Sequence, residues 1–210
     1  FDSTPSRPSA DARPPAVHGG GGLPRLFSSA QPPPTLGLAT TTPRPSHRTS
    51  YPAGPFGTSL RHVAAFITAE CSTPFYHVSL NGFDTHSNQA NPHDNLLHTL
   101  SAGLAAFQAD LRARRLDDQV LPMTFSEFGR RPGENASLGT DHGTSAPLFV
   151  LGSRVKGGLH GTAPALALAQ HQDLTFSTDF RQVYATVLED WLHCPAAAVL
   201  DSRMAKLAFL

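Results

Sequence analysis

Apolar residues repeat with helical spacing in three segments of the chain. The first segment predicts a helix over residues 59–70. The second predicts a helix that begins at Asn91 and Pro92, because the asparagine can cap it and the proline ring fits its first position, and that ends near Arg115. The third predicts a helix over residues 180–192, which ends before a proline. Its apolar face consists of Phe180, Val183, Tyr184, Val187, Leu188, Trp191 and Leu192.

Short apolar runs between these helices predict strands over residues 75–80, 120–125 and 148–151. Pro122 cannot donate a backbone hydrogen bond, so the second strand is expected at an edge, bulged or irregular at its start. A loop of about 20 residues without helical period joins the second and third strands, which favours an antiparallel pair and a functional loop. One more extended segment is expected near Leu159. The alternation predicts an α/β fold in which helices cover a mixed sheet.

Residues 1–55 show no such pattern. They hold 12 of the 19 prolines, together with a run of four glycines, and are expected to be disordered or loosely docked. Residues 56–210 are then expected to form the folded domain, which is long enough for one hydrophobic core. The chain starts at Phe1 without a signal segment, which predicts a fragment or a processed product.

Composition narrows the possible partners. The 16 basic and 16 acidic side chains cancel, and no basic run suggests a nucleic-acid partner. No apolar stretch approaches the roughly 18 residues of a membrane span. Cys71 and Cys194 are expected to be small packing residues rather than a disulfide pair.

Three polar clusters carry the residue types that bind metal ions. Asp84 and His86 lie two residues apart in NGFDTH, so in extended backbone both point the same way. Glu127 lies in SEFGR, and Asp141 with His142 lies between glycines in GTDHG. The first two clusters also have simpler interpretations: a surface turn at Asp84 and His86, and a solvated carboxylate paired with an arginine at Glu127. Together, the clusters predict a divalent metal site at one edge of the sheet.

The runs YHVSLNGFDTHSNQ, HDNLLHTLSAGLAAFQADL, MTFSEFGRRPGENASLGTDHGTSAPLFVLG, VKGGLHG and TDFRQVYATVLEDWL resemble the bacterial family known as domain of unknown function 1501. The resemblance covers about residues 56–200. Members of this family resemble the alkaline phosphatase and sulfatase superfamily and are commonly exported by the twin-arginine route, which implies an extracytoplasmic location. The fold implied is part of an alkaline-phosphatase-like layered domain.

The resemblance also implies roles for individual residues. Asp84 and His86 match the superfamily's first ligand pair, Glu127 its acidic ligand and His142 its last histidine. The implied ion is zinc, with calcium or manganese as alternatives. Phe128 stands where a phosphatase would have a histidine, which puts a two-zinc site in doubt. The superfamily's nucleophilic serine or threonine belongs to an element upstream of the resemblance, so no nucleophile is assigned.

Arg130 and Arg131 follow Glu127 closely, and a guanidinium fork suits the oxygens of a phosphate or sulfate ester. The alternative is a solvated pair that balances nearby glutamates. Four further histidines are expected to be structural or on the surface: His77, His93, His98 and His160. Of these four, His160 is the one best placed to reach the site.

Three functional hypotheses follow. The first is the metal-binding part of a phosphate- or sulfate-ester hydrolase, incomplete without its nucleophile, that takes a small anionic ester. The second is a non-catalytic exported module of the same fold that binds a glycan, an anion or a protein. The third is a truncated product whose exposed sheet edges favour aggregation.

Overall fold

A computed structural model of the protein describes residues 49–168 and 172–210. Of residues 1–55, which were expected to be disordered or loosely docked, residues 1–48 lie outside the described residues, whereas Tyr51 packs against the hydrophobic core and its hydroxyl donates to Asp110 at 2.9 Å. The first helix, α1 (Pro55–Thr68), begins earlier than its apolar spacing predicted. Pro55 lies at its start, where a missing backbone N–H costs nothing because that position has no partner in the helix. The helix ends before Glu70, whose φ of 53° is left-handed.

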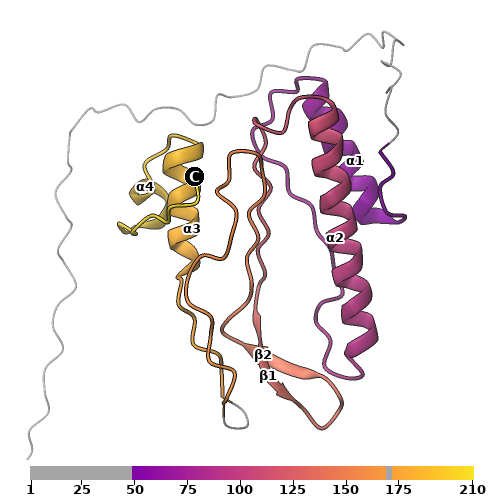
Figure 1. Cartoon of the computed structure of the whole chain (residues 1–210), viewed down its shortest axis with the longest axis vertical. Helices are drawn as coiled ribbons and strands as arrows, with labels where there is room; N and C mark the ends of the chain where they lie inside the picture. The colour runs from indigo at the N-terminus through magenta and orange to yellow at the C-terminus, as the bar shows by residue number, and fades with distance from the viewer. Residues whose placement is uncertain (1–48, 169–171) are drawn as a thin grey trace, which may run out of the picture. The chain divides into compact units, whose positions relative to one another are not determined.

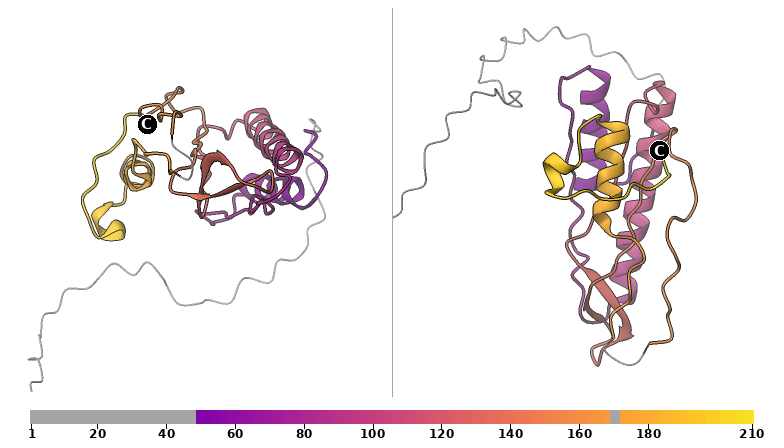
Figure 2. Two further views of the ribbon diagram at one scale, coloured as in Figure 1. Left: turned by 90° about the horizontal axis from the view of Figure 1, so that it is seen from below. Right: turned by 90° about the vertical axis from the view of Figure 1, so that its left-hand side faces the viewer.

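Helix α2 (Ala90–Ala113) covers nearly the predicted range and packs along α1 (Figures 1 and 2). The apolar faces of the two helices meet in the main hydrophobic core, as expected from their spacing. Its fully or nearly fully buried members are Phe56, Leu60, Ala64, Phe107 and Leu111.

The predicted strand over residues 75–80 is extended but is not paired into a sheet among the residues that the structure describes. Its side chains nevertheless alternate: Val78 and Leu80 are half-buried against the helical core, while Phe75 and His77 are exposed. The period of two expected of a strand is therefore present without the backbone ladder.

The strands predicted over residues 120–125 and 148–151 meet at a single antiparallel bridge between Met123 and Val150. Thr124 N donates to Phe149 O at 2.9 Å, and Leu151 N donates to the Pro122 carbonyl at 2.9 Å. The antiparallel direction agrees with the prediction. The mixed sheet does not: within the described ranges, the sheet has two strands and is purely antiparallel.

That sheet lies inside the loop that was predicted to lack secondary structure. Strand β1 (Gly129–Glu134) pairs with β2 (Thr140–Gly143), with Arg130 opposite His142 and a bulge further along. A Cβ at Gly143 would lie 2.7 Å from the backbone carbon of Arg130, so the strands approach at a glycine. The prediction of an unstructured loop was wrong because its glycine, arginine and proline residues carry little strand propensity.

The third predicted helix is two elements, α3 (Phe180–Thr186) and the π-helical η1 (Val187–Trp191). Asp179 and Gln182 form a capping box at its start. A short helix, α4 (Ala197–Leu200), follows and contacts α3 (Figure 1). The described residues are therefore a mixture of helix and strand, as predicted, and they include no helix of the length and apolar character that a membrane crossing requires.

Candidate metal centre

Asp84, His86 and His142 direct three ligand atoms at one point. The Oδ1 atom of Asp84 lies 2.9 Å from His86 Nε2 and 2.8 Å from His142 Nε2. The two Nε2 atoms lie 3.2 Å apart. Among the residues that the structure describes, no other set of three or more histidine, cysteine, aspartate or glutamate side chains converges in this way.

Two hydrogen bonds or one cation can hold this triangle. If both Nε2 atoms carry a proton, both donate to Asp84 Oδ1, which has lone pairs for both. If one or neither carries a proton, an imidazole lone pair faces the carboxylate oxygen, and one cation would accept all three lone pairs. An ion with tetrahedral bonds of about 2.0–2.1 Å holds its ligands about 3.3 Å apart, so the three atoms, which lie 2.8, 2.9 and 3.2 Å apart, would separate slightly on binding.

Local backbone geometry brings Asp84 and His86 to the same side. Thr85 N donates to Phe83 O at 2.9 Å, which bends the chain at this point, and the two ligands are separated by one residue as the sequence suggested. His142 comes from β2, 56 residues further along than His86. Tertiary structure must therefore join these two segments.

The tip of the β1–β2 hairpin provides that connection. Backbone N–H groups of Asn88 and Gln89 donate to the carbonyls of Ser137 and Leu138, each at 2.9 Å. Asn135 Nδ2 donates to the His86 carbonyl at 3.2 Å. The loop that carries two ligands is thus fixed by backbone contacts to the hairpin that carries the third, and these contacts set the ligand spacing.

The carboxylate of Asp84 has a lowered pKa. Its hydrogen bond with His142 is the largest cause, and the bond with His86 and the charges of both histidines act in the same direction, while partial desolvation opposes them. A carboxylate that remains ionised is ready to act as a metal ligand.

Glu127 and Asp141, which were also predicted as ligands, lie outside the group. Asp141 precedes His142 on β2, and neighbouring strand residues face opposite sides. Its carboxylate accepts a hydrogen bond from Asn135 Nδ2 at 3.1 Å instead. The side chain of Glu127 is exposed before the start of β1. The sequence alone did not distinguish Glu127 and Asp141 from the three residues that converge.

Phe128 packs directly on one ligand. Its ring stacks on the His142 imidazole with centroids 3.7 Å apart and an angle of 13° between the planes. In the sequence, Phe128 was noted only because a phosphatase would have a histidine at this position. In the structure, its ring provides a flat aromatic surface against the His142 imidazole.

The two arginines that were predicted to bind substrate have other partners. Arg131 Nε lies 3.3 Å from Asp173 Oδ1 in a partly exposed ion pair. The terminal nitrogens of Arg130 donate to backbone carbonyls. His160, which was expected to be structural or on the surface and was the other histidine best placed to reach the site, lies outside the triad. Its Nε2 atom lies 3.1 Å from the Lys156 carbonyl oxygen, and its ring contacts Phe209.

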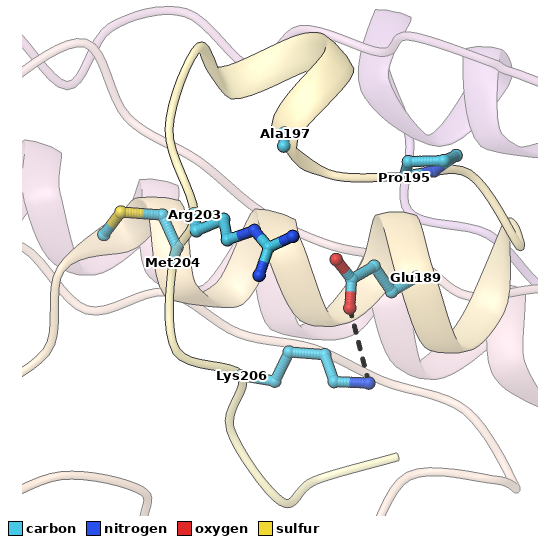
Figure 3. Close-up of a pocket in the computed structure, with 6 residues that line it drawn as sticks. All are labelled: Glu189, Pro195, Ala197, Arg203, Met204 and Lys206. Atoms are coloured by element: carbon cyan, nitrogen blue, oxygen red, sulfur yellow. Dashed lines mark ion pairs between the residues drawn. The ribbon is translucent and has the colours of Figure 1, made fainter.

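A separate cavity of about 410 Å³ lies near the C-terminus (Figure 3). Lys206 crosses one side of it and pairs with Glu189 at 3.5 Å and with Asp190 at 2.6 Å. None of its lining residues belongs to the converging triad. They are Glu189, Pro195, Ala197, Arg203, Met204 and Lys206.

The fold and site define a mixed α/β chain with a three-residue candidate metal centre. Residues 38–193 match the family described as protein of unknown function (DUF1501), and the chain belongs to that family. All three converging residues lie within the match, which confirms the family expected from the sequence. No match was found among curated proteins or among solved structures.

The affinity of the candidate site for a divalent metal ion is expected to fall about tenfold or more when the pH is lowered from about 7.5 to about 5.5, because protons compete with metal for imidazole nitrogens. The lowered pKa of Asp84 keeps its carboxylate charged over this range, so the loss should come from the histidines. Titration calorimetry in buffers of different ionisation heat would measure both affinity and proton release. Affinity that is constant over this range would contradict imidazole ligation.

Proposed function

We propose that this chain is the metal-binding part of a hydrolase that acts on phosphate or sulfate esters. The convergence of Asp84, His86 and His142 carries the metal part of the proposal. The ester class rests on the resemblance of the sequence to the alkaline phosphatase and sulfatase superfamily. The relation to the alkaline phosphatase and sulfatase superfamily is part of the proposal, whereas the chain's membership of DUF1501 is a finding.

The donor set favours zinc. Two imidazole nitrogens and one carboxylate oxygen match a catalytic zinc site, which has three protein ligands and one open position. Calcium prefers six to eight oxygen ligands, so two imidazoles make it a poor fit. Manganese remains the alternative because it accepts both imidazole and carboxylate ligands.

The contribution of the protein follows from the ligand geometry. A bound ion would polarise an ester oxygen and stabilise the negative charge that develops during cleavage. Asp84 offsets part of the ion's charge, and the hairpin holds His142 against the loop that carries the other two ligands. The nucleophile is not assigned.

One observation favours a second candidate, a non-catalytic exported module that uses the metal to hold a partner. The side chains of Asp84, His86 and His142 are 64%, 48% and 47% exposed. Hydrolytic sites usually exclude water, which strengthens electrostatic stabilisation. An open site of this kind instead suits an ion that binds an anionic group presented by another molecule.

Two measurements on the purified full chain separate these candidates. Metal analysis and calorimetric titration with zinc, manganese and calcium test for the site, and hydrolysis of p-nitrophenyl phosphate and p-nitrophenyl sulfate tests for turnover. Zinc binding at one ion per chain together with metal-dependent hydrolysis faster than that by free zinc supports the hydrolase; this turnover is expected to be slow, because the chain is proposed as the part without the nucleophile. Binding without hydrolysis favours the module, and the absence of metal binding overturns both candidates.

A further inference from the structure

Arg130 lies between the two segments that supply the metal ligands. Its Nη2 donates to the carbonyl of Phe83, the residue before Asp84. Its Nη1 donates at 2.6 Å to the carbonyl of Thr140, two residues before His142. One planar guanidinium therefore joins both ligand-bearing backbones, and its side chain is only 19% exposed.

Arg130 is also linked to the ligand His142 through the ring of Phe128. The Cζ atom of Arg130 lies 5.2 Å from the ring centroid of Phe128, which in turn stacks on the His142 imidazole. On the paired strands, Arg130 lies opposite His142. These contacts link the arginine to the orientation of the imidazole as well as to its backbone.

These contacts leave little freedom for Arg130 to bind an anionic substrate. Both of its terminal nitrogens are directed at backbone carbonyls. Nη2 is also 3.8 Å from Asp84 Oδ1, a distance suited to charge attraction rather than a hydrogen bond.

We propose that Arg130 is a positioning residue that holds Asp84 and His142 at ligand spacing before the metal binds. The inference rests on the metal site of the proposed function and goes beyond it, because it assigns the organisation of that site to one side chain. Arg131 provides the matched control: it is the next residue along β1, and its partner Asp173 is not part of the triad.

The test compares Arg130→Lys with Arg131→Lys in the full chain. A lysine ammonium is a single point of charge and cannot reproduce the two-armed contact with Phe83 and Thr140. Zinc affinity is expected to fall about 10–100-fold in Arg130→Lys, the usual cost of removing a partner that orients ligands, and to stay unchanged in Arg131→Lys. The absorption spectrum of bound cobalt should also change, because it reports ligand geometry rather than stability.

The outcomes separate this inference from the metal site itself. A wild-type chain that binds no zinc overturns the metal centre and the role of Arg130 together. A wild-type chain that binds zinc, with equal affinity and an equal cobalt spectrum in Arg130→Lys, overturns the role of Arg130 alone.

Arg130→Gln decides the question if Arg130→Lys does not fold. Its side chain has one terminal nitrogen in place of two and no charge, so at most one of the contacts with Phe83 and Thr140 can remain. We expect weaker zinc binding and an altered cobalt spectrum in a folded protein. An unchanged affinity and spectrum in this variant would overturn the inference.

Discussion

His142→Ala is expected to weaken zinc binding by about a hundredfold or more. Losing a partner that only orients a ligand already costs 10–100-fold, and this change removes a ligand atom. The remaining pair, Asp84 and His86, lies on one short segment and offers only two donors. Titration calorimetry of wild type and variant at constant pH would measure the change directly.

His98→Ala is the matched control, because this histidine is exposed on α2 and lies outside the triad. Its zinc affinity should equal that of the wild type. The thermal unfolding midpoint of metal-free His142→Ala should stay close to that of the wild type because the side chain is 47% exposed. Equal zinc binding by wild type and His142→Ala would show that the ion binds elsewhere or not at all.

Gly139→Ala is expected to weaken zinc binding about 10–100-fold without changing any ligand. A Cβ at this position would lie 2.3 Å from the backbone carbon of His86 and 2.4 Å from its oxygen. Both atoms belong to the backbone, so neither can rotate away, and the hairpin must move relative to the ligand loop. We also expect a loss of about 1–3 kcal/mol in the free energy of unfolding, as for other overpacked contacts.

Gly133→Ala is the control for this prediction, because a Cβ there meets nothing within 4 Å. Urea unfolding of the metal-free variants and zinc titration would measure the two effects separately. If Gly139→Ala binds zinc as tightly as Gly133→Ala, the close contact between hairpin and loop does not set the ligand geometry.

Much of the helical structure was predictable because helix formation leaves a local signal. Apolar residues that recur at helical spacing must face a core, and the faces of α1 and α2 do meet there. The start of α1 was placed too late, because the helix begins at Pro55 and already buries Phe56, four residues before Leu60 in the same apolar repeat. The π-helical continuation of α3 was not predictable, since a single π-helical turn changes the backbone hydrogen bonds while the side chains around it still follow α-helical spacing.

The sheet was predicted poorly because strand pairing depends on distant partners. Residues 75–80 alternate as a strand should, yet their backbone finds no ladder among the described segments. The β1–β2 hairpin forms where strand propensity is weak. Contacts of its tip with Asn88 and Gln89 stabilise it, and these lie about 50 residues away in the chain.

By itself, the sequence determined which residue types were available for chemistry and that Asp84 and His86 could act together, because residues two apart share a side in extended backbone. Only the tertiary structure decided that His142 joins them while Asp141 turns away. It also decided that Arg130 spans both ligand segments instead of facing solvent. The physical reason is that convergence of distant side chains depends on long-range backbone contacts, and these leave no periodic signal in the order of residues.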